Sequence, residues 1–190
     1  MKKLSMDELN RLNVEQFKEK EKIPVVIVLD NVRSALNVGS VFRTADAFAV
    51  KAIYLCGITA TPENREVMKT SLGAEKSVVW KYFATTSEAL SELKGVVGQE
   101  TNNGGVKIFA LEQVDESISL EKFHAKAQSR KEEIAFVFGI EVNGVSEECF
   151  PFLDGCIEIP QFGTKHSFNI SVTVGIVLWD YHLKNLFPQI

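Results

Sequence analysis

The sequence has no hydrophobic run long enough to cross a membrane. A transmembrane helix needs roughly 18 to 20 consecutive apolar residues, whereas the longest apolar stretch, at 170–179, is shorter and contains Ser171, Thr173 and Gly175. Residues 1–8 also lack the apolar core of a secretory signal peptide. Both absences predict a cytoplasmic protein.

Cysteine is scarce, with three residues in a chain of 190. Cys56, Cys149 and Cys156 are an odd number, and their spacing is not that of a metal site. Neither His124 nor His166 forms a paired motif with them. We therefore expect reduced thiols and no bound metal, which agrees with a cytoplasmic location.

Two common nucleotide-binding motifs are missing. No GxGxxG fingerprint follows the first apolar run, and no GxxxxGK[ST] phosphate loop occurs anywhere, which argues against standard NAD-dependent and ATP-dependent enzymes. The formal net charge of −4 argues against a surface coated with nucleic acid, because phosphate binding needs clustered Lys and Arg. A local basic patch is compatible with this charge. Its candidate members are Lys2, Lys3, Arg11, Arg33 and Arg43.

Short apolar runs alternate with helical patterns along the whole chain. Strands are predicted at 25–29, 52–55, 78–83, 106–111, 134–138 and 156–159. Helices are predicted at about 4–20, 38–48, 61–74 and 86–93, with a helical piece at about 120–127 and a long helix at the end. This alternation predicts an α/β fold with a mostly parallel sheet flanked by helices. No repeat, linker or low-complexity segment interrupts it, so we expect a single domain over 1–190.

The last predicted helix is apolar on nearly every side. Ser167 and Asn169 precede it, where side chains that cap free backbone N–H groups commonly gather. Residues 172–183 then leave almost no polar face. A helix of this kind is buried, here against the sheet, a partner subunit or both.

Three polar, glycine-bearing segments follow predicted strands, at 31–43, 139–144 and 160–169. In an open parallel sheet, ligands bind beyond the carboxyl ends of the strands, so we expect these segments to meet at one site.

Each of the three segments carries a short motif. The first runs from Asn37 through Gly39 to Arg43 and continues with Thr-Ala. The second, at 139–144, reads Gly-x-Glu-x-x-Gly. The third joins Ile-Pro at 159–160 to a later Gly and to a Ser-x-Asn-x-Ser run that begins at Ser167.

Together and in this order, the motifs resemble those of the SpoU family of AdoMet-dependent RNA ribose 2′-O-methyltransferases, which belongs to the SPOUT class. The resemblance covers about residues 25–182. Ala49 stands where the family usually has Gly, Phe168 where it usually has Leu, and Gln161 where Met is common. None of these departures removes a polar functional group, so we expect them to affect packing and the shape of the adenine pocket.

The resemblance implies a fold and a cofactor. The last strand and helix are expected to thread through a loop and form a deep trefoil knot, as in the SPOUT methyltransferase fold. S-adenosyl-L-methionine (AdoMet) is expected to lie bent in that knot, held largely by backbone groups, and to leave as S-adenosylhomocysteine. By position, those backbone groups belong to Leu111, Gly139, Ile159 and Phe168.

The resemblance also implies that Asn37, Arg43, Glu141, Ser167 and Asn169 serve methyl transfer to a ribose 2′-hydroxyl of tRNA or rRNA. In the family proposal Arg43 is the base. A guanidinium is protonated at any ordinary pH, so we favour a grip on the adjacent phosphate and stabilisation of alkoxide charge.

Structural roles compete with these functional ones. Asn37 could cap the helix that bears Arg43, Ser167 and Asn169 could act as N-caps alone, and Glu141 could bond only loop N–H groups. His166 and its neighbour Lys165 are further candidates for RNA contact.

The resemblance implies a homodimer in which the C-terminal helices pack together and each active site is completed by the other subunit. The alternative is a catalytically silent SPOUT-fold protein that binds RNA or serves as a scaffold. The net charge of −4 favours that alternative, and the polar residues of the three motifs oppose it.

Overall fold

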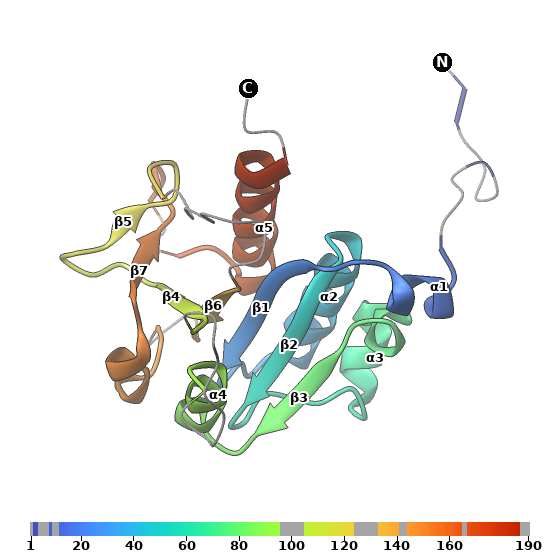
Figure 1. The fold of residues 1–190 in the computed structure, drawn as a ribbon, viewed down its shortest axis with the longest axis horizontal. Helices are drawn as coiled ribbons and strands as arrows, with labels where there is room; N and C mark the ends of the chain where they lie inside the picture. Colours follow the sequence, from blue (N-terminus) through green and yellow to red (C-terminus); the bar gives the residue numbers. More distant parts are fainter. Residues whose placement is uncertain are drawn as a thin grey trace.

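The structure is a computed structural model that describes residues 2–3, 8, 12–95, 105–123, 133–140, 144–164 and 167–186. Within these residues, seven parallel strands form one sheet in the order β3-β2-β1-β6-β4-β7-β5 (Figure 1). The strands are β1 (Ile23–Asp30), β2 (Val50–Cys56), β3 (Trp80–Phe83), β4 (Lys107–Leu111), β5 (Ile118–Ser119), β6 (Ile134–Phe138) and β7 (Gly155–Glu158). The prediction of an α/β fold with a parallel sheet between helices is confirmed.

β1 lies in the interior of the sheet, between β2 and β6. Its residues 25–29 are at most 1% exposed, because helices cover both faces of the strand. A parallel strand in this position reads as a continuous apolar run, which is the pattern that predicted it.

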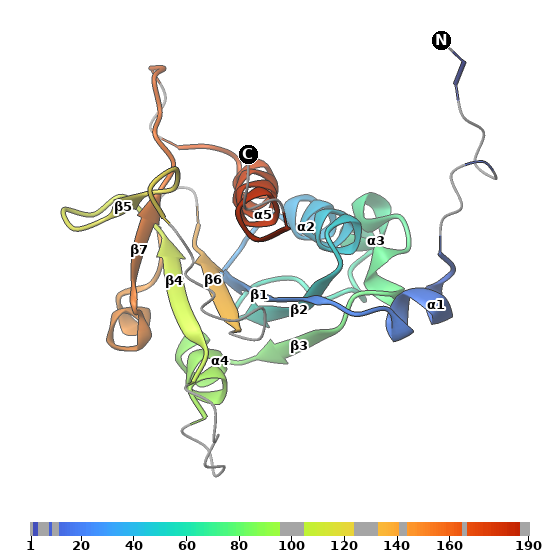
Figure 2. The same cartoon turned by 45° about the horizontal axis from the view of Figure 1, so that its top comes forward.

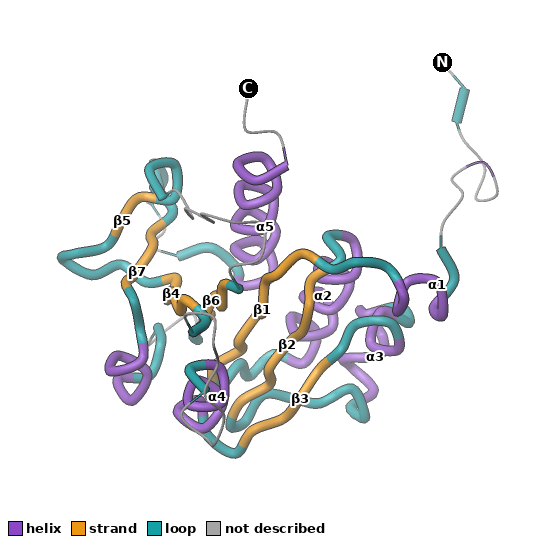
Figure 3. Tube along the Cα trace, in the orientation of Figure 1, coloured by secondary structure: helices purple, strands orange, loops and turns teal. Residues whose placement is uncertain are grey.

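Helices form a layer on each face of the sheet (Figures 2 and 3). On one face lie α2 (Ala35–Ala47), α3 (Arg65–Ser71) and α5 (Ile170–Leu186), and on the other lie α4 (Thr86–Leu93) and the 3-10 helix η3 (Glu147–Phe152). The short helices α1 (Val14–Glu19) and η2 (Ala74–Lys76) complete the set within the described residues. Val25, Ile27 and Leu29 point into the α2 and α5 side of the core, whereas Val26 and Val28 point toward α4.

Gly39 allows α2 and α3 to cross closely. A Cβ at this position would lie 2.1 Å from Thr70 Oγ1 and 2.3 Å from the carbonyl oxygen of Val67. Thr70 Oγ1 also donates to the carbonyl oxygen of Leu36 at 2.8 Å, which ties the two helices together. The glycine of the first motif is therefore required by helix packing, whatever else the motif does.

Several predicted boundaries differ from the structure. The predicted helix at 4–20 is present as α1 from Val14, because Asn13 caps it in a reciprocal pair with Gln16; residues 4–7 and 9–11 lie outside the described part of the chain. Similarly, α3 begins at Arg65, since Asn64 is its N-cap.

The helical piece predicted at about 120–127 is wrong where it is described. Residues 120–122 form a turn and Phe123 is irregular, while 124–127 fall outside the described residues. The two-residue strand β5, which precedes this turn and pairs with β7, was not predicted.

One face of α5 is buried and the other is open. Val174, Val177 and Leu178 are fully buried against the sheet and α2, whereas Val172 and Trp179 are 49% and 53% exposed. Within one chain, α5 therefore buries one apolar face and leaves apolar side chains on its other face exposed to solvent. No helix in the described ranges is long and apolar enough to span a membrane.

Candidate active site

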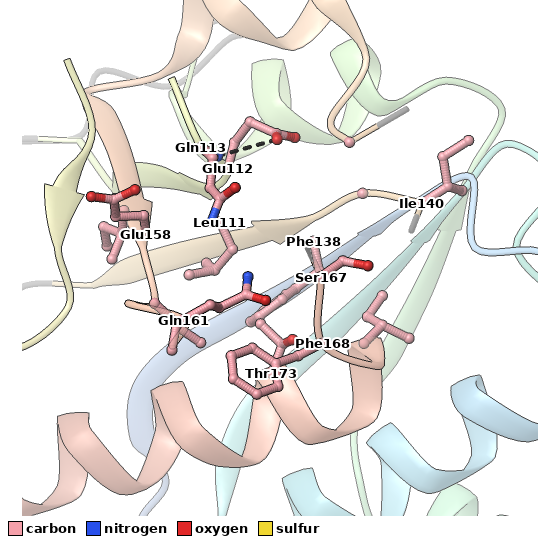
Figure 4. A pocket seen from close by; sticks show the side chains of 15 residues that line it. Leu111, Glu112, Gln113, Phe138, Ile140, Glu158, Gln161, Ser167, Phe168 and Thr173 are labelled. Carbon is pink, nitrogen blue, oxygen red and sulfur yellow. Dashed lines mark hydrogen bonds between the residues drawn. The ribbon is translucent and has the colours of Figure 1, made fainter. Parts of the chain in front are cut away.

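A cavity of about 400 Å³ opens at the carboxyl ends of β4, β6 and β7, beside the start of α5 (Figure 4). Small-molecule sites typically have roughly 300–1,000 Å³, so this cavity can hold a whole ligand. Leu111, Gly139, Ile159 and Phe168, the four residues predicted to bind a cofactor, all line it, and so does Ser167. The structure thus brings together residues from three separate segments of the sequence.

The lining combines apolar side chains with a few polar ones. Glu112 and Gln113 lie opposite the α5 side of the cavity, where Phe168 and Thr173 are found (Figure 4). Glu112 and Glu158 are the charged side chains among the described lining residues, and both are acidic. The cavity therefore suits a ligand with an apolar ring system and a positive charge.

The two described ends of the second motif lie against each other. Ile140 and Gly144 exchange two backbone hydrogen bonds of 3.0 and 2.9 Å. A Cβ on Gly139 would lie 2.0 Å from the carbonyl oxygen of Gly144, and Gly144 itself has a φ of 68°, which favours glycine. Both motif glycines are thus explained by geometry. Glu141 lies outside the described residues, as do Lys165 and His166.

Glu112, directly after β4, holds the chain that follows Gly144. Its Oε2 accepts a hydrogen bond from the backbone N–H of Val145 at 2.8 Å, and its Oε1 accepts one from Gln113 N at 3.2 Å. Sequence reasoning missed Glu112. Its signal was available, because a charged residue directly after a predicted strand is placed at the carboxyl edge of the sheet.

A smaller cavity of about 140 Å³ adjoins the first, at the carboxyl ends of β1 and β6. Arg33, Ser34 and Asn37 line it from the β1 side. Gly139, Ile140 and Ile170 line both cavities, so they form a shared wall.

Asn37 and Asn169 meet beside the smaller cavity. Asn169 Nδ2 donates to Asn37 Oδ1 at 3.2 Å, which joins the first and third motifs. Asn169 also precedes α5 and accepts from the backbone N–H of Ser171 at 2.9 Å, as an N-cap does. The N-cap of α2 is Ser34, which accepts from Asn37 N, so the suggestion that Asn37 caps this helix is wrong.

Arg43 is not among the described residues that line either cavity. It is exposed on α2, six residues after Asn37. That spacing corresponds to about 9 Å along the helix and to a different face of it. By helical spacing Arg43 instead lies on the same side of α2 as Leu36 and Ser40, of which Leu36 is exposed and Ser40 half-buried.

A second residue that the sequence analysis missed is Asp30, which supports the site from the end of β1. It ends β1, is 1% exposed, and accepts hydrogen bonds from Thr86 Oγ1, Asn31 Nδ2 and Ser146 N at 2.5, 2.8 and 2.7 Å. Three donors satisfy its charge. The bond to Ser146 anchors the chain that follows the second motif.

The three cysteines are free thiols away from this chemistry. Burial raises the pKa of Cys56 and of Cys149 to about 12, so both stay protonated at neutral pH. A protonated, buried thiol is a poor nucleophile. Covalent catalysis by these two residues is therefore disfavoured.

The model of the SpoU rRNA Methylase family matches residues 24–179, which is most of the chain and includes all three motifs. The chain belongs to the SpoU family. All the described lining residues of both cavities fall within residues 24–179.

Among curated SpoU-type relatives, the chain is similar to the 23S rRNA (guanosine-2′-O-)-methyltransferase RlmB of Neisseria meningitidis serogroup B, with 29% identity over 82% of this chain and 56% of that protein. It is also similar to a Staphylococcus aureus protein assigned to the TrmH family of tRNA/rRNA methyltransferases, with 28% identity over 90% of this chain and 63% of that one. The chain thus spans about three fifths of the length of these relatives.

Solved structures share the SpoU fold. The A. aeolicus TrmH/SpoU tRNA-modifying enzyme superimposes with a TM-score of 0.75 at 24% identity, over 92% of this chain and 83% of that one. The AdoMet-bound rRNA methyltransferase of Sinorhizobium meliloti gives a TM-score of 0.72 at 23% identity, over 89% and 60% of the two chains.

Proposed function

We propose that this SpoU-family chain is an AdoMet-dependent RNA methyltransferase that modifies a ribose 2′-hydroxyl of tRNA or rRNA. The observation that carries the proposal is the 400 Å³ cavity, which is bounded by the segments after β4, β6 and β7 and receives residues of the second and third motifs. Relatives named as tRNA or rRNA methyltransferases, one of them a ribose 2′-O-methyltransferase, support the reaction type.

The larger cavity fits AdoMet in size and in charge. Leu111, Ile159 and Phe168 offer an apolar slot for the adenine, and their backbone groups offer hydrogen bonds. Glu112 and Glu158 place negative charge where a sulfonium cation gains from it. When bound, AdoMet supplies a methyl group activated by the sulfonium, which passes to the ribose oxygen as the hydroxyl proton leaves to solvent.

The protein's own residues position the acceptor. Asn37 and Asn169, joined to each other, offer amide groups that orient a ribose hydroxyl. Ser167 is exposed at the rim of the larger cavity, within reach of the same region. Glu141 is proposed to position Asn37 or to accept hydrogen bonds from backbone N–H groups of the knot. Arg43 is proposed to bind phosphate and stabilise alkoxide charge, since guanidinium is a permanent cation with a forked set of donors.

We infer that the active unit is a homodimer. Val172 and Trp179 of α5 and Leu36 of α2 are exposed, and the two helices pack against each other. We infer that these side chains belong to an apolar surface that a second copy would cover. Arg43 lies on the same side of α2 as Leu36 and away from its own subunit's cavities. This arrangement supports a dimer in which Arg43 serves the site of the partner.

The trefoil knot and a cytoplasmic location are also proposed. Family membership supports the knot. The larger cavity also supports it, because it is bounded by the segments after β4, β6 and β7, which are the segments that the knot would bring together. Three free thiols support a reducing compartment.

Calorimetric titration with AdoMet and with S-adenosylhomocysteine tests the cofactor. Micromolar binding of both is expected, followed by transfer of labelled methyl to RNA from a strain that lacks the gene. Recovery of 2′-O-methylated nucleosides after digestion would identify the position modified.

A folded dimer that binds AdoMet but methylates no RNA fraction would contradict the enzymatic proposal. It would favour the alternative of a silent RNA-binding or scaffold protein. Methylation at a base, with the ribose unchanged, would contradict the assignment of the acceptor atom.

A further inference from the structure

The smaller cavity has a position that the proposed cofactor site does not explain. It lies between the carboxyl ends of β1 and β6, where the order of strands in the sheet reverses direction. Crevices at such reversal points are where open α/β sheets bind ligands. Gly139, Ile140 and Ile170 form a wall shared with the larger cavity. A group bound here is therefore a direct neighbour of whatever fills the larger cavity.

The size and polarity of the smaller cavity suit a sugar. Its volume of about 140 Å³ is below the roughly 300 Å³ at which sites for whole small-molecule ligands begin. A furanose ring with its hydroxyls fits such a volume better than a complete nucleoside. Ser34 and Asn37 bring a hydroxyl and an amide to it, and Asn37 Nδ2 makes no hydrogen bond with the described residues.

Arg33 adds a permanent positive charge at this cavity. Its side chain is exposed and makes no ion pair with any residue in the described ranges. A guanidinium binds phosphate oxygens with two parallel hydrogen bonds. Among the described arginines, Arg33 is the one that lines a cavity, which places its free charge beside the polar groups of Ser34 and Asn37.

We propose that the smaller cavity binds the ribose of the acceptor nucleotide and that Arg33 binds a phosphate attached to that ribose. This inference rests on the proposed function, because it names the subsite for the RNA. It gives Arg33 a role separate from that of Arg43, which lines neither cavity. Because the two cavities share Gly139, Ile140 and Ile170, a ribose bound here borders the larger cavity, where the methyl donor is proposed to bind.

The test compares Arg33→Gln with Arg65→Gln in the full chain. Arg65 is also exposed, but it belongs to α3 and is not among the lining residues of either cavity. The two variants lose the same charge from different places. The probes are AdoMet, measured by calorimetry, and bulk tRNA and rRNA from a strain that lacks the gene, measured by filter binding and by methyl transfer over a series of salt concentrations.

For Arg33→Gln we expect a KM for RNA raised by about tenfold and a log–log salt slope reduced by about 0.7 to 0.9, the loss of one phosphate contact. The AdoMet dissociation constant and the melting temperature should match those of the wild type. Arg65→Gln should match the wild type in every assay.

Two results would overturn the subsite while the proposed function stands. One is methyl transfer by Arg33→Gln with the wild-type KM and salt slope, and the other is an equal change in Arg65→Gln. If the wild-type protein binds AdoMet and transfers methyl to no RNA, the proposed function fails and the subsite fails with it.

Discussion

Arg43 makes no hydrogen bond or ion pair with the described residues, so its substitution should leave the fold intact. We expect Arg43→Ala to lower the rate of methyl transfer by roughly 100-fold or more, the usual effect of removing a donor that stabilises developing charge. AdoMet affinity should be nearly unchanged, because Arg43 is not among the described lining residues of the larger cavity. Single-turnover transfer and calorimetry measure the two effects separately.

The conservative variant Arg43→Lys separates charge from geometry. Lysine keeps the positive charge but loses the planar fork that binds phosphate bidentately, so we expect only partial recovery of the rate. Loss of AdoMet binding in folded Arg43→Ala protein would show that this division of roles is wrong.

Glu112 is expected to stabilise both the fold and the cofactor cavity. Glu112→Ala removes the acceptor for the N–H of Val145, a residue that is 4% exposed, and for the N–H of Gln113. An unsatisfied buried donor costs about 1–3 kcal/mol, and in a chain of this size each kcal/mol lowers Tm by roughly 2–4 °C. We also expect weaker AdoMet binding, since Glu112 lines the larger cavity and its bond to Val145 N holds the chain that follows Gly144.

Thermal unfolding of Glu112→Ala beside Glu116→Ala checks this expectation. Glu116 is exposed in the same connection and makes no hydrogen bond or ion pair within the described residues. If both variants unfold at the wild-type temperature, the hydrogen bonds of Glu112 contribute nothing to stability.

At the scale of single elements, the end of α2 explains one departure from the family pattern. Ala49 follows the C-cap Phe48 and has a φ of 51°, the left-handed conformation in which helices commonly place glycine. Alanine pays about 1–2 kcal/mol for this conformation. The family's usual glycine is therefore a backbone requirement, whereas the sequence alone suggested an effect on packing.

Ala49→Gly should leave stability nearly unchanged, because relief of backbone strain offsets the loss of a buried methyl and the greater freedom of glycine in the unfolded chain. Ala45→Gly is the matched control: Ala45 is fully buried inside the same helix, so the change should cost about 1–2 kcal/mol. Chemical denaturation measures both values. Equal losses would contradict the strain at Ala49.

The elements predicted best are those with a continuous apolar pattern. Burial on both faces gave β1, β2 and β6 continuous apolar runs in the sequence, and α4 begins where it was predicted, directly after its N-cap Thr85. The N-caps Asn13 and Asn64 were not recognised, so the predicted starts of α1 and α3 lie too early. β5 was missed because two residues carry no periodicity, and its existence depends on pairing with β7, which lies about 40 residues later in the chain.

The site was predicted to a similar depth. The resemblance to the SpoU family implied that Leu111, Gly139, Ile159 and Phe168 surround the cofactor, and the structure groups them around one cavity. The division into two cavities with a shared wall was not predictable, because it depends on how α2 and α5 sit against the strand ends. Nor was the place of Arg43 outside both, which depends on the rotation of α2.

At the scale of the whole molecule, the open face of α5 is expected to mediate dimerisation. Trp179→Glu places a charge on a side chain that is 53% exposed, packs edge-to-face with Phe48 and stacks on His182. A buried, unpaired charge is costly in an interface, so this variant should become monomeric and lose methyl transfer. Light scattering measures the mass in solution.

Ile58→Glu is the control, because Ile58 is 63% exposed on a different part of the molecule. It should stay dimeric and active. A wild-type protein that is fully active with the mass of one chain would contradict the dimer and its shared active site.

The position of β1 between β2 and β6 has a consequence for synthesis on the ribosome. β1 is the first strand made, but β6, its neighbour on one side, begins at Ile134, about 100 residues later. At translation rates of about 5–20 residues per second, the apolar edge of β1 waits roughly 5–20 s for its partner. An unpaired strand edge is a template for pairing with other chains. We therefore expect slower translation through 31–133 to increase aggregation of the nascent chain, and chaperones to reduce it, without any change in the stability of the finished protein.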